Sequence, residues 1–320
     1  MNKIEKLKDI LRDKKIAIAF SGGADSTLIL YIASKVSDNP LAITIDNHIM
    51  PDGFIDHTQK VCEDFGVRQE IIDVNFYENE KIMENPFDRC YQCRDEMYKL
   101  ITEKAHEEGY STIVDGTNIS DLVADRPGIL INYKNNIKSP FVECRLDSKE
   151  IHEYLNENNI NYSKSTTCLS TRLPFNEHVT QEKLEDIDLC EKVIYDNTDC
   201  EIVKVRSLPS MHLIEVDDFN DILDENKLNS IYDQLKELGC NKVCLNITKI
   251  DDDEEIILDY ENNGFVYKLP YEIDLEKTEL ANKRIEIKSD GTVIGKDFNS
   301  YNEALEEFME VLPTIRRTVP

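Results

Sequence analysis

The chain has 320 residues, of which 40% are hydrophobic and 32% charged, and no apolar run in it approaches the length of a membrane span. This length exceeds the usual size of one domain, so we expect two domains and an additional tail. The formal net charge of −27 opposes attraction to a polyphosphate backbone, which disfavours a nucleic acid as partner. The charged N-terminal segment lacks the apolar core of a signal peptide, so we expect a cytoplasmic protein.

The first half of the chain alternates apolar strand patterns with amphipathic helix patterns. This alternation predicts an α/β fold, an open parallel sheet covered on both faces. Strands are expected at 15–20, 41–46, 68–74, 112–115 and 136–139, and helices at 27–35, 55–65, 90–108 and 148–158, the last with Ser148 as its N-cap.

The second half predicts a smaller α+β domain. Thr180 begins a helix, strands are expected at 200–207, 211–216 and 242–250, and a helix is expected at 228–238. A hairpin at 284–295 around Asp290-Gly291 and an acidic helix at 301–311 follow. We therefore predict a first domain at 1–165, a polar linker loop at 166–178, a small domain at 179–264 and a C-terminal extension of unknown role at 265–320.

The most informative stretch joins the first strand to the first helix of this sheet. In Ser21-Gly22-Gly23-Ala24-Asp25-Ser26, the two glycines allow a tight turn that brings the backbone close to a ligand. The first amides of the helix would bind an anion, and the two serines add hydroxyl donors. Asp25 suits a Mg²⁺ ion that a nucleotide would bring. The stretch therefore predicts a site for nucleotide phosphates, beyond the carboxyl ends of the strands.

The Ser-Gly-Gly-x-Asp-Ser pattern after a strand resembles the loop of the PP-loop ATPases, which cleave ATP between the α and β phosphates. This resemblance implies ATP with Mg²⁺ as the bound nucleotide. It also implies that an oxygen of a second substrate attacks the α-phosphorus and forms an adenylate, with Asp25 as a catalytic residue.

Further motifs resemble the LarE family, in the same order. They are Asn85 to Arg94 (NPFDRCYQCR), Val114 to Asn118 (VDGTN) with Asp125 to Gly128 (DRPG), Ser139-Pro140, and Thr167 to Arg172 (TCLSTR). The resemblance runs from about residue 15 to about residue 260. It implies a sulfur insertase in the assembly of the nickel-pincer nucleotide cofactor of lactate racemase. Such an enzyme adenylates carboxylates of pyridinium-3,5-biscarboxylic acid mononucleotide and converts them to thiocarboxylates. The resemblance also implies a homo-oligomer, and it leaves the sulfide source open.

Nine cysteines in a chain without secretory features argue against a disulfide framework and direct attention to metal or sulfur chemistry. Three of them lie in the quoted motifs. Cys90 and Cys93 lie on the same side of the first turn of a predicted helix, where the helix dipole favours thiolates. Cys168, in the linker loop, could lie over the same edge of the sheet. The other six are expected to be small hydrophobic residues: Cys62, Cys144, Cys190, Cys200, Cys240 and Cys244.

Three thiolates would satisfy three irons of a 4Fe-4S cluster and leave the fourth iron open for a hydrosulfide. Within the LarE resemblance, the pattern of Cys90, Cys93 and Cys168 implies such a cluster, whereas members with only the cysteine matching Cys168 sacrifice its sulfur. Two alternatives stay open. One is a three-cysteine zinc site with a fourth ligand, and the other is a sacrificial Cys168 with Cys90 and Cys93 as core thiols.

Positive side chains must neutralise the phosphates in this acidic protein. Arg126 and Arg172 are candidates for phosphate contacts through their forked donors. The resemblance adds Arg206 on the strand at 203–206, although the family commonly has Arg where Lys204 stands. It also places Gly116 and Thr117 at the nucleotide.

The alternatives from other functional classes are a cluster-dependent tRNA thiolase and a non-catalytic ATP-binding or cluster-carrier protein. The net charge argues against the tRNA thiolase.

Overall fold

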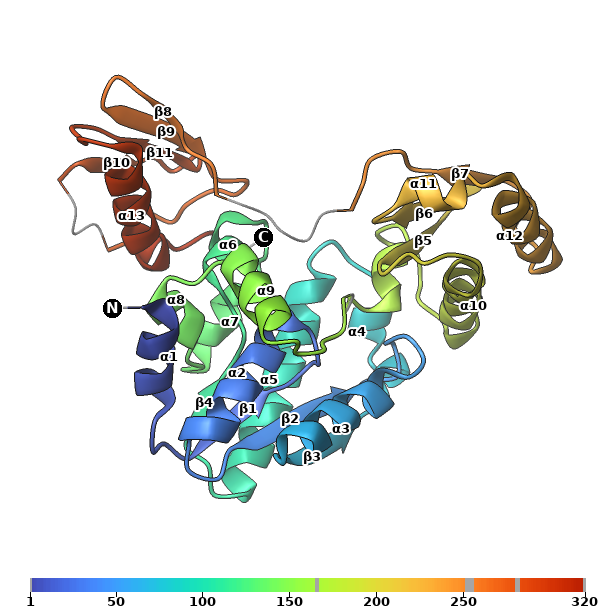
Figure 1. Ribbon diagram of the computed structural model, residues 1–320, viewed down its shortest axis with the longest axis horizontal. Helices are drawn as coiled ribbons and strands as arrows, with labels where there is room; N and C mark the ends of the chain where they lie inside the picture. The colour runs from blue at the N-terminus through green and yellow to red at the C-terminus, as the bar shows by residue number, and fades with distance from the viewer. Residues whose placement is uncertain (1, 165–166, 251–255, 280–282, 319–320) are drawn as a thin grey trace.

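A computed structural model describes residues 2–164, 167–250, 256–279 and 283–318. Three units follow one another along the chain, each with its own sheet (Figure 1). Within these ranges no helix has both the length and the apolar character needed to cross a membrane. The expected boundary between residues 165 and 166 lies outside the described residues.

The first unit contains the predicted parallel sheet. Its strand order is β3-β2-β1-β4, and the strands are β1 (Ile16–Ala19), β2 (Leu41–Asp46), β3 (Arg68–Asp73) and β4 (Thr112–Val114). The strand expected at 136–139 is wrong, since that segment makes only a single bridge from Lys138 to Val114. Pro140 instead begins the helix α8 (Pro140–Cys144), because proline has no N–H to continue a ladder and its φ suits the first turn of a helix.

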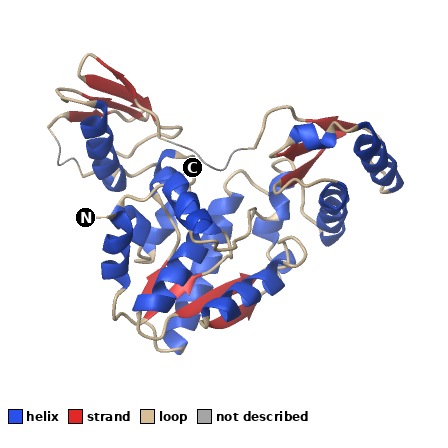
Figure 2. Cartoon of the chain, viewed as in Figure 1, coloured by secondary structure: helices blue, strands red, loops and turns tan. Residues whose placement is uncertain are grey.

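Helices cover both faces of this sheet (Figure 2). Side chains alternate along β1, so Ile16 and Ile18 pack in one core and Ala17 in the other. The first core is covered by α1 (Lys3–Leu11), α2 (Ala24–Val36), α3 (Phe54–Phe65) and α9 (Ser148–Glu157), and the second by α5 (Arg89–Glu107) and α7 (Ile129–Lys134). Short helices complete the unit: η1 (Phe76–Glu78), α4 (Glu80–Met83) and α6 (Ile119–Val123).

Helix α9 begins where expected, but its N-cap is Asp147 and not Ser148. The Asp147 carboxylate accepts from the amide of Glu150, and the Glu150 side chain accepts from the amide of Asp147. This reciprocal pair satisfies two amides, which a serine one residue later would not do.

The second unit is the predicted small α+β domain. It contains η2 (Leu169–Arg172), α10 (Gln181–Asn197), β5 (Val203–Leu208), β6 (Met211–Val216), α11 (Phe219–Ile222), α12 (Glu225–Glu237) and β7 (Val243–Leu245). The expected strand at 242–250 is shorter than predicted. Thr180 caps α10 as predicted, and three of the expected hydrophobic cysteines, Cys190, Cys200 and Cys240, are buried in the core of this unit.

The third unit contains β8 (Asp259–Glu261), β9 (Gly264–Lys268), β10 (Ile285–Ile287), β11 (Thr292–Gly295), α13 (Tyr301–Val311) and η3 (Leu312–Thr314). The β10–β11 hairpin and the last helix confirm the prediction. The boundary expected between residues 264 and 265 falls inside β9. Asn262 and Asn263 adopt left-handed conformations that turn β8 back onto β9, so both strands belong to this third unit. Ile256 already packs in the core of this unit.

Candidate functional site

A cavity of about 520 Å³ lies at the carboxyl ends of the parallel strands. It brings together segments that are far apart in the sequence, namely the glycine loop, the N-terminus of α5, the segments around residues 116 and 126, and the linker loop. Of the predicted site residues, those on its wall are Ser21, Asp25, Ser26, Cys90, Cys93, Gly116, Thr117, Arg126 and Cys168.

The glycine loop forms one end of this cavity. Gly22 has φ +73°, and a Cβ there would lie 2.9 Å from Cδ2 of His57, so both backbone and space favour glycine. Gly23 is the N-cap of α2 and has no side chain to cap the first amides of that helix. The Ser26 hydroxyl donates to the Gly23 carbonyl at 3.2 Å and accepts from the Ser21 amide at 3.3 Å. The first amides of α2, which no side chain caps, are therefore the donors that an anion would meet.

Asp25 is partly buried beside two other carboxyl groups, those of Asp121 and Asp115. Burial first, and the neighbouring Asp121 second, raise the pKa of Asp25 to about 7, while the amide of Asn118 donates to its Oδ1 at 2.9 Å. Gly116 makes this packing possible, because a Cβ there would lie 2.6 Å from Cβ of Asp25. A divalent cation would relieve this clustering of carboxylates.

Replacing Asp25 by Asn tests this electrostatic state. The folded protein without Mg²⁺ holds the Asp25 proton up to about pH 7, whereas the unfolded chain releases it near the ordinary aspartate pKa of 3.8. Stability therefore falls as pH rises through that window. We expect Asp25→Asn to be more stable than the wild type at pH 8 in EDTA, measured by thermal unfolding, and to lose ATP cleavage by about 100-fold or more. Equal stability at pH 8 would contradict this account.

Arg94 lies on the cavity wall, although sequence reasoning did not select it. Its Nη2 donates to the buried Asp115 carboxylate at 2.6 Å and to the hydroxyls of Tyr98 and Thr117 at 3.0 and 3.2 Å. Its Nε is buried and has no hydrogen-bond partner among the described residues. The signal in the sequence was the pair of arginines, Arg89 and Arg94, on either side of the two cysteines.

Arg126 lies at the rim of the cavity, where it pairs with the carboxylate of Asp121 and keeps much of its side chain exposed. It is therefore placed where a phosphate contact was expected.

Arg172 and Arg206 are not on the cavity wall. Arg172 is 2% exposed, and its Nε donates to Glu191 at 2.7 Å while its Nη1 donates to Thr167 and Thr171 at 2.7 Å each. Arg206 donates to Glu215 at 2.6 Å and to the carbonyl of Thr171 at 3.0 Å. Because these donors are engaged within the protein, both arginines hold the loop of Cys168, which differs from the phosphate contact expected of them.

Two residues of the NPFDRCYQCR motif join the cysteine segments. The buried Arg89 donates from Nη1 to the carbonyl of Ser170 at 2.8 Å and to the side chain of Asn85. Asn85 in turn donates to the carbonyl of Pro174 at 2.7 Å. These bonds connect the N-terminus of α5, which carries Cys90 and Cys93, to the linker loop that carries Cys168.

The electrostatics of the thiols depart from the sequence expectation. Burial raises the pKa of Cys93 and of Cys168, and the nearby Arg89 guanidinium opposes that shift in both. Arg89 Nη2 also lies 3.5 Å from Sγ of Cys90. Without a metal these two partly buried cysteines are therefore thiols, and binding a metal would release their protons.

The donor set suits an iron–sulfur cluster, since three thiols and a neighbouring cation border one cavity. In the described part of the chain, however, no three Cys, His, Asp or Glu side chains form a ready-made metal site.

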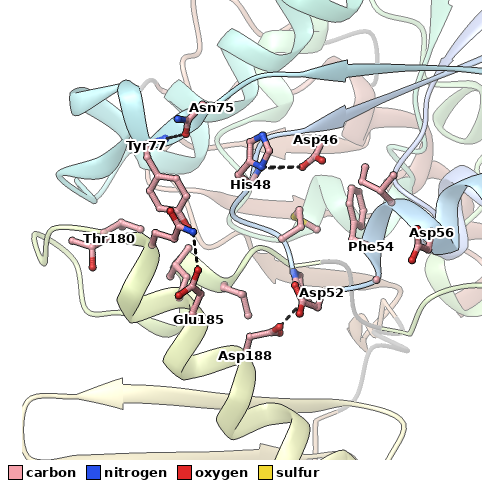
Figure 3. Close-up of a pocket in the computed structure, with 18 of the residues that line it drawn as sticks. Asp46, His48, Asp52, Phe54, Asp56, Asn75, Tyr77, Thr180, Glu185 and Asp188 are labelled. Carbon is pink, nitrogen blue, oxygen red and sulfur yellow. Dashed lines mark hydrogen bonds and ion pairs between the residues drawn. The ribbon is translucent and has the colours of Figure 1, made fainter.

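A second cavity, of about 690 Å³, adjoins the first, and Met50 and Phe54 line both. It lies between α10 and the loop after β2 (Figure 3), and the amide of Asp52 donates to the Asp188 carboxylate across it at 3.2 Å. Carboxylates dominate its wall, namely Asp46, Asp52, Asp56, Glu185 and Asp188. No Arg or Lys is among the described residues that line this second cavity, whereas Arg89, Arg94 and Arg126 line the first, which favours the first cavity as the nucleotide site.

His48, in this second cavity, offers a pH test of the structure. Its Nε2 lies 2.9 Å from Asp73 Oδ1, and that hydrogen bond is the largest cause of a raised His48 pKa. A raised histidine pKa stabilises the fold at low pH, and this contribution is lost as pH rises through the folded-state pKa. NMR titration should place the His48 pKa above 6.5, and Asp73→Asn should lower it. An unchanged titration in this variant would contradict the assignment.

The parallel sheet, the glycine loop at the end of β1 and the cavity beyond the strand ends define the class of protein. The PP-loop domain family matches residues 1–125, so this is a PP-loop protein that binds ATP. Similarity to individual proteins extends beyond this domain.

An uncharacterized protein of Methanocaldococcus jannaschii is 32% identical over 242 residues, which cover 75% of this chain and 92% of that protein. An uncharacterized protein of Synechocystis is 30% identical over 220 residues, covering 67% of this chain and 81% of the relative. The pyridinium-3,5-bisthiocarboxylic acid mononucleotide synthase of Lactiplantibacillus plantarum is 25% identical over 247 residues, covering 75% and 87%. The chain belongs to the LarE family of PP-loop ATP-dependent sulfur transferases.

Proposed function

We propose that this enzyme adenylates the carboxylates of pyridinium-3,5-biscarboxylic acid mononucleotide and replaces a carboxylate oxygen with sulfur. The observation that carries the proposal is one cavity bordered both by the glycine loop and by Cys90, Cys93 and Cys168. The name of the Lactiplantibacillus plantarum relative supports the choice of substrate.

In the first step, a carboxylate oxygen of the substrate attacks the α-phosphorus of ATP. The bond from that phosphorus to the oxygen bridging the β-phosphorus breaks, and pyrophosphate leaves. The amides of the glycine loop and Arg126 stabilise the phosphate charge, and Asp25 holds the Mg²⁺ that accompanies ATP. The product is an acyl adenylate, whose AMP is a good leaving group.

In the second step, the sulfur of a hydrosulfide attacks the carbonyl carbon of the adenylate. The bond between that carbon and the AMP oxygen breaks, AMP leaves, and the hydrosulfide proton is released. The step needs no oxidant or reductant, and it consumes one hydrosulfide from an external sulfide source.

Cys90, Cys93 and Cys168 would hold a 4Fe-4S cluster through three of its irons, and the cluster would supply an open iron site for the hydrosulfide. Arg89 and Asn85 position these cysteines by joining their two segments. Arg89 also eases deprotonation of Cys93 and Cys168.

The substrate is tested by measuring AMP release with the pyridinium mononucleotide and, in parallel, with bulk tRNA. We expect release with the mononucleotide alone. AMP release stimulated by tRNA alone would indicate a tRNA thiolase and overturn the proposal. No pyrophosphate release with either substrate would indicate a non-catalytic ATP-binding or cluster-carrier protein. The LarE resemblance also leads us to expect a cytoplasmic homo-oligomer, and light scattering of the purified protein tests the oligomeric state.

A further inference from the structure

The C-terminal unit packs against the segment that forms one rim of the ATP cavity. Its apolar residues Leu312 and Ile315 share a core with Ile119, Leu122 and Ile129 of the first unit. In Figure 1 this unit lies beside α6. The unit lies almost entirely beyond the resemblance found in the sequence, which ends near residue 260.

Two polar contacts attach the C-terminal unit to this rim. The hydroxyl of Tyr271 donates to the carbonyl of Leu122, near the C-terminus of α6, at 2.6 Å. The Nη1 of Arg317 donates to Asp125 Oδ1 at 2.6 Å, and the guanidinium lies 5.0 Å from the ring of Tyr271. The Arg317 side chain is 12% exposed and the Asp125 side chain is 51% exposed, so water reaches this ion pair mainly from the Asp125 side.

The other side of the same segment faces the nucleotide site. Asn118, the N-cap of α6, donates to Asp25 at 2.9 Å. Asp121, within α6, pairs with Arg126. Residues 125–128 line the ATP cavity. Arg317 therefore binds the residue immediately before Arg126, and Tyr271 binds the residue immediately after Asp121.

We propose that Arg317 and Tyr271 are positioning residues for ATP, which hold the segment at 121–128 so that Arg126 faces the phosphates. The C-terminal unit thereby completes the nucleotide site from outside the PP-loop domain. This inference rests on the ATP site of the proposed function and is independent of the sulfur source and of the second substrate.

The test compares Arg317→Ala and Tyr271→Phe with Glu310→Gln. The control weakens the 3.2 Å ion pair between Arg145 and Glu310, which joins the same two units without touching the segment at 121–128. We expect Arg317→Ala to raise the KM for ATP in pyrophosphate release by about fivefold to tenfold, with kcat within about twofold of the wild type. Tyr271→Phe should shift KM in the same direction by less, and Glu310→Gln should leave it unchanged.

Direct binding of a non-hydrolysable ATP analogue to the full chain separates this inference from the proposed reaction, because it needs no second substrate. Arg317→Lys keeps the positive charge and should recover part of the affinity. Equal ATP affinity in Arg317→Ala and Glu310→Gln, at equal thermal stability, would overturn the proposal. If Arg317→Ala does not fold, an ATP affinity of Tyr271→Phe equal to that of the wild type would overturn the proposal.

Discussion

Cys168→Ala is expected to abolish sulfur transfer by the reconstituted enzyme while leaving pyrophosphate release intact. Cys168 lies on the wall of the cavity that also contains Asp25 and Ser21, but it is not part of the glycine loop that binds ATP. The variant therefore removes one of the three proposed cluster ligands and keeps the residues proposed for adenylation. After anaerobic reconstitution with iron and sulfide, iron content and visible absorption should both fall, and mass spectrometry should detect no thiocarboxylate.

Cys244→Ala is the matched control, because Cys244 is also partly exposed but lies in the small domain on β7. It should keep both iron and sulfur transfer. Cys90→Ala and Cys93→Ala should behave like Cys168→Ala. Wild-type iron and absorption in Cys168→Ala would exclude the three-ligand cluster, and a dehydroalanine at position 168 after turnover of the wild type would establish the sacrificial route. Stoichiometric zinc in place of iron would favour the three-cysteine zinc site.

Arg172→Ala is expected to cost about 3–5 kcal/mol of stability, because it leaves the Glu191 carboxylate buried without its cation. Arg172 is 2% exposed and Glu191 is 4% exposed. The Glu191 oxygen that accepts a hydrogen bond from Arg172 Nε also accepts one from the amide of Val205, at 2.9 Å. The loss should also loosen the loop of Cys168, to which Arg172 donates through Thr167 and Thr171. Denaturant unfolding of the metal-free protein measures the change.

Arg126→Ala is expected to affect ATP binding much more than stability, the opposite of Arg172→Ala. Arg126 is largely exposed at the cavity rim, so its loss should change stability by well under about 1 kcal/mol while it weakens ATP binding. The two arginines were equivalent candidates for phosphate contacts in the sequence, and the pair of variants separates their roles. An Arg172→Ala protein of wild-type stability with weakened ATP binding would restore Arg172 as a phosphate ligand.

The features that the sequence predicted well are local ones. The glycine loop is a short pattern whose left-handed turn is made by Gly22 itself, so its place between β1 and α2 could be predicted without knowledge of distant residues. The alternation of strands and helices similarly predicted the parallel sheet, and Asp290-Gly291 predicted the β10–β11 hairpin.

Local patterns in the sequence were thus enough to predict the class of the fold, the nucleotide loop and the residue types available for sulfur chemistry. Which arginines face the cavity depends on packing, because Arg126 and Arg172 differ in burial and in partners that are distant in sequence. The tertiary structure alone revealed the bonds from Arg89 and Asn85 that join the cysteine segments. It also decided that the C-terminal unit reaches the rim of the ATP site, since the contact between Arg317 and Asp125 depends on packing between units, which no local pattern encodes.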